Sequence, residues 1–309
     1  MKKWTAAAGL VIGMAALGGA LAFQGAAQVP AQRGGGAPYE VLGSLVHDLP
    51  DPARGIPYQI YVSLPPGYAD NPDRRYPVVY TTDADYGFPM IRLIGRRMNG
   101  AGPRVEEMIV VGLSYALGED TMASRRRDYT PTARGASDAP AGAVHGQSLA
   151  YRDYLRDTVI PFVEAKWRAQ PGKRVFAGHS YGGLLGAQIL LTQPDMFDGY
   201  ILGSPSFWYD RQHLLKAAPG LLDEQREINA DVFLYVGEFE ARRVGDRRYM
   251  QEVDMVADNR TFTELLRARA YPGLTVTSEE LDGDDHLSVA PRGITRGLLH
   301  LLPTPAARR

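Results

Sequence analysis

The stretch RVFAGHSYGGLLGAQILL, residues 174–191, places a serine between two apolar segments. Residues 174–177 have the character of a short buried strand, and the apolar residues from Leu184 onward have the spacing of an amphipathic helix. Ser180 lies at the junction, with Gly178 and Gly182 on either side of it. A tight turn from a strand into a helix leaves no space for side chains at those two positions, so the pattern predicts a nucleophile elbow. The alternative is a glycine-rich turn in which the serine only caps the helix.

The N-terminal segment is typical of a secretory signal peptide. Lys2 and Lys3 precede an apolar run over residues 6–22, and small residues follow at Ala22 and Ala27, after either of which we expect cleavage. A retained membrane anchor is the alternative, which the high alanine and glycine content disfavours. We therefore expect a signal peptide at residues 1–27, a flexible leader at 28–38, one catalytic domain at 39–303, and a periplasmic or secreted location.

Composition narrows the class of protein. The chain has 309 residues, no cysteine and a formal net charge of −1. After removal of the signal peptide, about 280 residues would remain, enough for one large α/β domain. Without cysteine there is no disulfide, so the core alone must stabilise the fold. The mildly acidic balance argues against nucleic acid as the main partner, and no second apolar stretch is long enough to span a membrane.

Strand-like and helix-like patterns alternate along the domain. The first two strand-like runs form an antiparallel pair, while later runs are separated by helical patterns, as in a mostly parallel sheet covered on both faces. Together with the elbow, this predicts an α/β-hydrolase fold, a mostly parallel eight-stranded sheet flanked by helices. Residues 209–230 could form a small helical insertion over the site. The expected strands are 39–45, 58–64, 76–82, 108–114, 174–177, 200–204, 232–237 and 274–280, and the expected helices are 150–167, 183–192, 246–270 and 294–302.

A serine nucleophile needs a histidine base and an orienting carboxylate, which in this fold follow it in the order acid, then histidine. Of the six histidines, four come before the expected acid, and His300 lies in an apolar run. His286 remains, in the polar loop LDGDDHLSV after the last expected strand. The same loop has an alternative reading as a divalent-metal site, formed by His286 with Asp282, Asp284 and Asp285. Because the EF-hand spacing is absent, we expect no metal and no other cofactor.

The acid and the oxyanion donors are less sharply defined. Glu238 and Glu240 both follow the strand at 232–237, and spacing does not choose between them. One oxyanion donor should be the backbone N–H of Tyr181, the residue after the nucleophile. The other should come from the loop after the strand at 76–82, where the backbones of Ala84 and Asp85 are candidates. The alternative for that loop is a solvated turn.

These residues together resemble the putative esterase family of α/β-hydrolases, which includes enterobactin-type siderophore esterases, feruloyl esterases and S-formylglutathione hydrolases. The segments that carry the resemblance are LPPGYADNPDRRYPVVYTTDAD, RRRDYTP, FAGHSYGGLLGAQILLTQPDMFDGYILGSPSFWY, LYVGEFE and DDHLSV, which span nearly the whole domain. The resemblance implies Ser180 as nucleophile, His286 as base and Glu240 as acid, with Asp85 at the oxyanion position. The usual Leu-Asp-Gly is Thr82-Asp83-Ala84 here.

We therefore expect a serine carboxylic-ester hydrolase that forms an acyl-enzyme on Ser180. Its partner would be a small-molecule ester, either of siderophore type or otherwise rich in oxygen. An acyltransferase of the same fold and a non-catalytic binding protein are the alternatives, and a peptidase is disfavoured because no gating domain precedes the hydrolase region. Neither the ester itself nor the oligomeric state follows from the sequence.

The substrate-binding residues are expected at the same edge of the sheet. Arg125 and Arg127 follow the strand at 108–114, in SRRRDYTP, and alternation would place them on one side with Arg126 pointing away. Arginine binds carboxylate or catecholate oxygens through two parallel hydrogen bonds. Trp208, between Phe207 and Tyr209, would supply an aromatic wall. The alternative is a solvated loop in which one arginine pairs with Asp128.

Overall fold

The computed structural model describes residues 36, 40–100, 102–135, 139–305 and 307. The expected signal peptide (1–27) lies outside these residues, as does the expected leader (28–38) apart from residue 36. The chain divides into two units, Met1–Leu42 and Gly43–Arg309, and every element below belongs to the second. No helix in the described ranges is long and apolar enough to cross a membrane.

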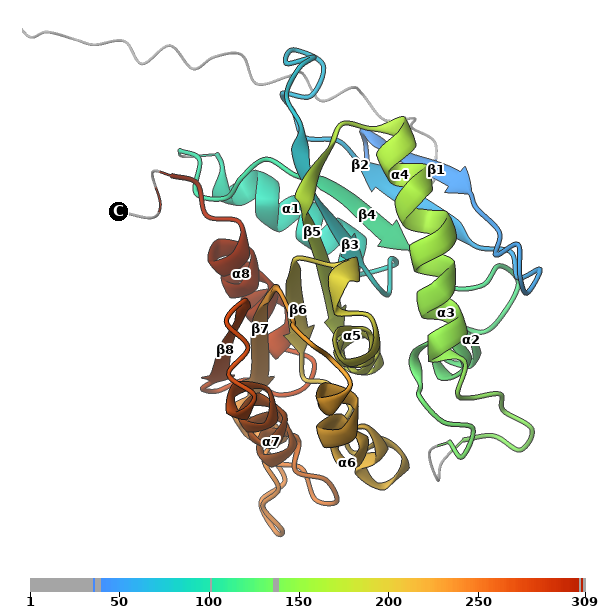
Figure 1. Ribbon diagram of the computed structural model, residues 1–309, viewed down its shortest axis with the longest axis vertical. Helices are drawn as coiled ribbons and strands as arrows, with labels where there is room; N and C mark the ends of the chain where they lie inside the picture. The colour runs from blue at the N-terminus through green and yellow to red at the C-terminus, as the bar shows by residue number, and fades with distance from the viewer. Residues whose placement is uncertain (1–35, 37–39, 101, 136–138, 306, 308–309) are drawn as a thin grey trace, which may run out of the picture. The chain divides into compact units, whose positions relative to one another are not determined.

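The predicted eight-stranded sheet is confirmed (Figure 1). Its strand order is β1-β2-β4-β3-β5-β6-β7-β8. β2 pairs antiparallel with both β1 and β4, and the other neighbours pair in parallel. All the parallel strands therefore end at one edge of the sheet, where ligands of such sheets bind. The strands are β1 (Ser44–Asp48), β2 (Gln59–Ser63), β3 (Tyr76–Thr81), β4 (Ile109–Leu113), β5 (Ala169–His179), β6 (Gly199–Gly203), β7 (Ala230–Gly237) and β8 (Leu274–Leu281).

Helices connect the parallel strands. α3, a π-helical segment (Leu155–Val159) and α4 follow one another without a gap, so the helix expected at 150–167 spans residues 148–166. Two 3₁₀ turns, Pro194–Met196 and Glu238–Glu240, follow α5 and β7. The α-helices are α1 (Gly87–Met98), α2 (Thr121–Tyr129), α3 (Ser148–Tyr154), α4 (Ile160–Lys166), α5 (Tyr181–Thr192), α6 (Tyr209–Asp223), α7 (Met255–Ala268) and α8 (Val289–Leu301).

The central strand β6 is buried throughout because helices cover both of its faces. Successive side chains of a strand point to opposite faces. On β6, Ile201 lies against Gly297 of α8, whereas Leu202 lies against Gly186 of α5. α5 and α8 therefore pack on opposite faces of the sheet. Burial on both faces also explains why β6 is apolar at nearly every position instead of alternating.

Several expected boundaries were wrong. β1 begins at Ser44 rather than residue 39, and α7 begins at Met255 rather than residue 246. Asp254 sets that start, because its side chain accepts a hydrogen bond from the N–H of Ala257 and caps the helix. Two helices, α1 and α2, were not among those expected from the sequence. α2 is rich in arginine and has almost no apolar face, so its sequence lacks the periodicity by which helices are recognised.

Candidate active site

Ser180 occupies a sharp turn between β5, which ends at His179, and α5, which begins at Tyr181. Its backbone has φ 59° and ψ −119°, a conformation that non-glycine residues rarely adopt. A Cβ atom on Gly178 would lie 2.3 Å from the carbonyl oxygen of Gly182, and one on Gly182 would lie 2.2 Å from Oγ1 of Thr82. Only glycine fits at either position. The turn therefore has the geometry of the predicted elbow, with the serine at the carboxyl edge of the sheet.

His286 approaches Ser180 from a different part of the chain. It lies in the loop between β8 and α8, and its Nε2 is 3.0 Å from Oγ of Ser180. Oγ of Ser206 lies 3.2 Å from the same Oγ. At 3.0 Å the imidazole is within hydrogen-bond reach of the hydroxyl, as a general base must be.

Glu240 holds the other side of the His286 ring. Its Oε2 lies 2.7 Å from Nδ1 of His286, and its Oε1 accepts hydrogen bonds from Oγ of Ser204 (2.6 Å) and from the N–H of Gly237 (2.8 Å). The side chain is fully buried. Burial acts to raise the pKa of this carboxyl, but the hydrogen bonds from His286, Ser204 and Gly237 outweigh it and leave the pKa below its usual value. Glu240 is therefore ionised at neutral pH.

Glu238, the other candidate acid, faces elsewhere. It accepts hydrogen bonds from the hydroxyl of Tyr249 (2.7 Å) and from the N–H of Gly283 (2.9 Å). These contacts join the loop after β7 to the loop after β8. The geometry thus separates two carboxylates that spacing could not: Glu240 contacts His286, and Glu238 connects two loops.

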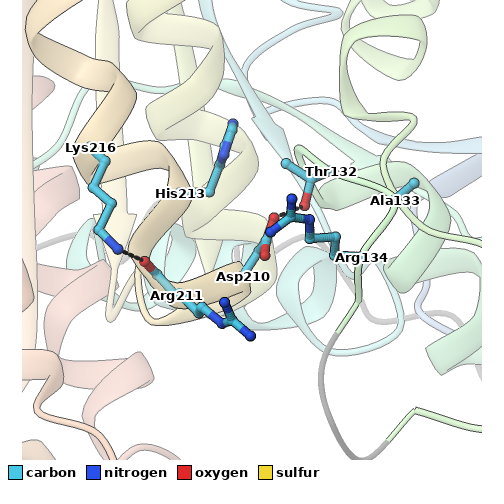
Figure 2. Close-up of a pocket in the computed structure, with 7 residues that line it drawn as sticks. All are labelled: Thr132, Ala133, Arg134, Asp210, Arg211, His213 and Lys216. Atoms are coloured by element: carbon cyan, nitrogen blue, oxygen red, sulfur yellow. Dashed lines mark hydrogen bonds between the residues drawn. The ribbon is translucent and has the colours of Figure 1, made fainter.

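His179 has a supporting position that the sequence analysis missed. It is buried, its ring centroid lies 4.7 Å from that of His286, and its Nε2 lies 2.8 Å from the backbone oxygen of His286. Burial, and then the nearby His286, lower the pKa of His179 to about 3. A neutral ring can donate from Nε2 to the His286 carbonyl and so fix the loop that carries His286. The other histidines lie apart: His300 contacts Asp231, and His213 is exposed in a separate pocket (Figure 2).

The loop after β3 is part of the site, not a solvated turn. Asp83 is buried and has φ 54°, and its carboxylate accepts hydrogen bonds from the hydroxyls of Tyr86 (3.0 Å) and Tyr115 (2.8 Å) and from Nε of Arg125 (2.8 Å). Burial, and then the charge of Asp83, raise the pKa of both tyrosines, so both phenols remain protonated donors. The next residues in the loop bring Asp85 to the pocket beside Ser180.

That pocket has a volume of about 410 Å³ and contains Ser180 and His286. Its lining combines polar groups with apolar side chains from the β8–α8 loop and α8. Arg125 lines it and lies 5.5 Å from the ring centroid of Tyr181, the first residue of α5. The remaining lining residues are Asp85, Tyr86, Met90, Tyr115, Thr121, His179, Leu287, Ala290 and Pro291.

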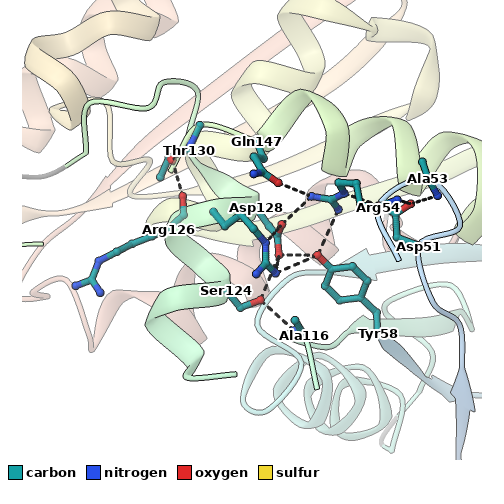
Figure 3. A network of polar contacts seen from close by, with 12 residues as sticks. Asp51, Ala53, Arg54, Tyr58, Ala116, Ser124, Arg126, Asp128, Thr130 and Gln147 are labelled. Atoms are coloured by element: carbon teal, nitrogen blue, oxygen red, sulfur yellow. Dashed lines mark hydrogen bonds and ion pairs between the residues drawn. The ribbon is translucent and has the colours of Figure 1, made fainter. Parts of the chain in front are cut away.

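The expectation that Arg127 shares a side with Arg125 was wrong, because the segment is a helix instead of an extended strand. Residues two apart on a helix point in nearly opposite directions, about 200° around the axis. Arg127 is buried, and its guanidinium binds Asp128 (2.8 and 3.0 Å) and the hydroxyl of Tyr58 (3.3 Å). Asp128 also accepts hydrogen bonds from Tyr58 (2.8 Å) and Arg54 (3.1 Å), and Figure 3 shows this network around it. It ties α2 to the segment that precedes β2.

Trp208 does not line the pocket either. It is half-buried, with its ring centroid 5.9 Å from that of Tyr181, and it is absent from the residues that line the pocket. The expected aromatic wall comes instead from Tyr86 and Tyr115. The sequence signal for these two was weak, because a single tyrosine in a loop does not reveal which way it faces.

The acidic residues near His286 have structural partners. Asp285 accepts hydrogen bonds from the backbone N–H groups of Leu287 and Ser288, and Asp284 contacts Arg292 and Ser288. Among the described residues, no group of three or more His, Cys, Asp or Glu side chains is arranged to hold a metal ion. The carboxylates of this loop fix its shape around His286.

Comparison with known proteins agrees with this architecture. Residues 53–286 match the family model described as "Putative esterase". Ferri-bacillibactin esterase BesA of Bacillus subtilis (strain 168) is 28% identical over 272 residues, which cover 84% of this chain and 90% of that protein. Siderophore triacetylfusarinine C esterase of Aspergillus fumigatus is 28% identical over 264 residues, which cover 79% of this chain and 88% of that protein. The solved structure of siderophore hydrolase EstB from Aspergillus nidulans has a TM-score of 0.69 at 27% identity. The match covers 86% of this chain and 96% of that one.

The family match extends over most of the chain, including Ser180, Glu240 and His286. The relatives align over most of their own length, so the similarity is not confined to the elbow. The parallel sheet and the strand–serine–helix turn are those of the α/β-hydrolase fold. The chain therefore belongs to the putative esterase family of α/β-hydrolases and is an esterase.

Proposed function

We propose that this esterase works through an acyl-enzyme on Ser180, with His286 as general base and acid and Glu240 as the orienting carboxylate. The observation that carries the proposal is the unbroken chain of contacts, Ser180 Oγ to His286 Nε2 at 3.0 Å and His286 Nδ1 to Glu240 Oε2 at 2.7 Å. Three residues from three different loops meet in the order that a serine hydrolase requires.

In the first half of the reaction, Oγ of Ser180 attacks the ester carbonyl while its proton passes to Nε2 of His286. The carbonyl oxygen becomes an oxyanion, for which the N–H groups of Tyr181 and Asp85 are the proposed donors. Support for this pair comes from their positions, the first residue of the helix after the elbow and a pocket-lining residue of the loop after β3. When the tetrahedral intermediate collapses, the ester C–O bond breaks and His286 returns the proton to the leaving alcohol.

In the second half, a water molecule attacks the acyl carbon of the serine ester. His286 accepts a proton from the water, and the bond from the acyl carbon to Oγ then breaks as the proton passes to Ser180. The free acid leaves and the enzyme returns to its starting state. An acceptor alcohol in place of water would give acyl transfer, so the identity of the products separates hydrolysis from the transferase alternative.

Glu240 has two tasks in this scheme. Its contact with Nδ1 keeps the proton on that nitrogen, so that Nε2 faces Ser180 as the acceptor. Its negative charge then stabilises the imidazolium that forms in each half-reaction. The depressed pKa of Glu240 supports both tasks, because the carboxylate must stay ionised while the neighbouring ring gains and loses a proton.

For the substrate we propose small, oxygen-rich esters of the siderophore type. Support comes from the names of the relatives, three of which are siderophore esterases, and from the donors in the pocket. Arg125, Tyr86 and Tyr115 offer N–H and O–H groups to the pocket, and its lining also includes apolar residues such as Met90 and Leu287. Arg125 is already paired with Asp83, and Asp85 lies beside it, so the pocket has no excess of positive charge. We therefore expect recognition by directed hydrogen bonds more than by net charge.

We also propose that the protein is exported, with the N-terminal segment removed after Ala22 or Ala27. The charged start, the apolar run and the small residues that follow support this. N-terminal sequencing of the protein from its native host tests it, and an intact Met1 in a cytosolic fraction would contradict it.

The experiment that tests the proposed activity is turnover of an ester panel that includes a macrocyclic trilactone siderophore, measured for the wild-type protein, Ser180→Ala and His286→Ala. Each variant should lose on the order of 10⁴-fold or more in kcat while thermal stability is preserved. The acid and alcohol products should appear with no transfer to added acceptor alcohols. More than about a tenth of wild-type turnover in either variant, at normal stability, would remove that residue from the mechanism.

A further inference from the structure

A second and larger pocket lies outside the catalytic site. It has a volume of about 700 Å³ and is formed by two segments, the residues that follow α2 and the first part of α6 (Figure 2). It shares no lining residue with the pocket that holds Ser180. Its lining residues are Thr132, Ala133, Arg134, Asp210, Arg211, His213 and Lys216.

The lining is strongly cationic, although the whole chain carries a formal charge of only −1. The lining includes three cationic side chains, Arg134, Arg211 and Lys216, and one carboxylate, Asp210. The formal charge of the lining is therefore +2, with His213 neutral. Within the part of the chain that the structure describes, none of the three cations forms an ion pair with a carboxylate. Lys216 donates to the backbone oxygen of Arg211, and all three side chains are exposed. The pocket therefore presents three exposed cationic groups, none of which pairs with a carboxylate among the described residues.

The backbone that presents Arg211 is strained. Asp210, Arg211 and Gln212 have φ values of 45°, 57° and 63°, three consecutive non-glycine residues in the left-handed conformation. Left-handed backbone is unfavourable for such residues and normally occurs singly. Contacts on both sides hold the turn: Oγ1 of Thr132 donates to Asp210 (2.6 Å), and the Gln212 amide donates to Asp258. Strained backbone that is anchored in this way is often found at ligand-binding sites.

The Asp210 carboxylate is engaged by the opposite wall of the pocket. Its contact with Thr132 joins the two segments that form the pocket, and the hydroxyl of Tyr209 adds a second link by donating to the backbone oxygen of Thr132 (2.9 Å). The ring of Tyr209 also packs against that of Tyr181, with 5.8 Å between the ring centroids. The walls are thus joined to each other before any ligand binds.

We propose that this pocket binds a small multivalent oxyanion, such as an inorganic phosphate or sulfate ion or a polycarboxylate. Two guanidinium groups and one ammonium group line a single hollow, which suits a ligand that offers acceptor oxygens in several directions. A neutral ligand would leave the excess positive charge uncompensated. The proposal does not depend on the esterase mechanism, because no residue of this pocket belongs to the proposed catalytic set.

The test is isothermal titration calorimetry on the full-length protein at an ionic strength of about 0.01 M, where surface charges are little screened. The probes are inorganic sulfate, inorganic phosphate and citrate, with glucose as the neutral control. We expect one ion bound per chain and no binding of glucose. The comparison of citrate with the inorganic ions shows whether carboxylates or tetrahedral oxyanions are the preferred class, and either preference supports the site.

Three variants localise the site. Arg134→Gln and Arg211→Asn should each weaken binding by roughly fivefold or more, as expected for loss of a charge-assisted contact. Asparagine is chosen at position 211 because it tolerates left-handed backbone better than most residues. Arg226→Gln removes an exposed cation from the loop after α6, outside the pocket, and is the matched control for net charge. It should leave affinity unchanged, because it lies outside the pocket.

Turnover of a small ester should be unchanged in all of these variants, because none of the substituted residues belongs to the proposed catalytic set. The anion site can therefore fail its test without affecting the proposal for the catalytic site. Absence of saturable binding for every anion would overturn the oxyanion site. So would an equal loss of affinity in Arg226→Gln, because the binding would then reflect overall charge alone.

Discussion

The Glu240 carboxylate lies 2.7 Å from Nδ1 of His286, while the carboxylate of Glu238, only two residues earlier, contacts Tyr249. Two chemically identical side chains at the end of one strand thus have different surroundings. Glu240 is buried and held by Ser204 and the N–H of Gly237, whereas Glu238 is partly exposed and joins two loops. This difference determines which carboxylate contacts the imidazole of His286.

The first prediction compares the two carboxylates directly. Glu240→Gln should lower kcat by on the order of 10³- to 10⁴-fold, because the amide neither fixes the His286 tautomer nor stabilises the imidazolium. Glu238→Gln should keep kcat within about threefold of wild type, since Glu238 does not contact His286. Steady-state kinetics on one ester checks both. If Glu238→Gln is the more damaging substitution, the roles are reversed, and if neither costs more than about tenfold, Ser180 and His286 act as a pair.

The second prediction concerns Ser204, whose hydroxyl donates to Glu240. Ser204→Ala should lower the free energy of unfolding by about 1–3 kcal/mol at pH 7, because a buried carboxylate loses one of its donors. The pKa of Glu240 is depressed in the folded state, so its stabilising contribution is present above the ordinary glutamate pKa and is lost as the pH falls through the depressed value. The difference between the two proteins should therefore shrink below about pH 4.3.

Urea denaturation of the wild-type protein and Ser204→Ala at neutral and acidic pH provides the measurement. A stability difference that stays constant or grows as the pH falls would show that the Ser204 hydroxyl does not act through the ionised carboxylate.

The third prediction separates the two arginines of α2. Arg125→Met should raise KM by roughly tenfold, since the side chain lines the pocket of Ser180. Arg127→Met should instead lower the free energy of unfolding by about 2–3 kcal/mol, because Asp128 would lose one of its buried cations and keep Arg54. Its KM should remain near that of wild type. Steady-state kinetics and thermal denaturation of both variants test this. If Arg127→Met raised KM as much as Arg125→Met does and left stability unchanged, Arg127 would be a substrate-binding residue after all.

A matched pair of esters with the same acyl group, one neutral and one anionic, refines the role of Arg125. Because Asp83 already pairs with this guanidinium, Arg125→Met should raise KM for both esters, with at most a few-fold larger effect on the anionic one. An effect confined to the anionic ester would mean that Arg125 acts as a free positive charge despite its contact with Asp83.

Much of the fold and the central pair of site residues could be predicted because their signals are local. The glycines around Ser180 reflect close approaches within one turn, and the strands of the parallel sheet are short apolar runs. The position of His286 followed from the order of the residues and from a polar loop after the last strand. These features need no knowledge of what lies opposite them in the folded chain.

The rest depends on contacts between distant segments. Which glutamate faces His286 is set by Ser204, on the loop after the neighbouring strand. Asp83 becomes part of the site only because Tyr86, Tyr115 and Arg125 converge on it. Arg127 was misplaced because α2 carries no apolar periodicity to reveal a helix, and one partner of its guanidinium, the hydroxyl of Tyr58, comes from a segment about 70 residues away.

The central claim, an acyl-enzyme on Ser180, is tested most directly by identifying the residue that carries the acyl group. The protein would be mixed with a slowly released ester or a fluorophosphonate, quenched in acid, digested and analysed by mass spectrometry. We predict one adduct per chain, on Ser180, with none in His286→Ala under the same conditions. An adduct on another residue would contradict the mechanism. So would turnover of the ester with no adduct on Ser180, if a fluorophosphonate also failed to inhibit the protein.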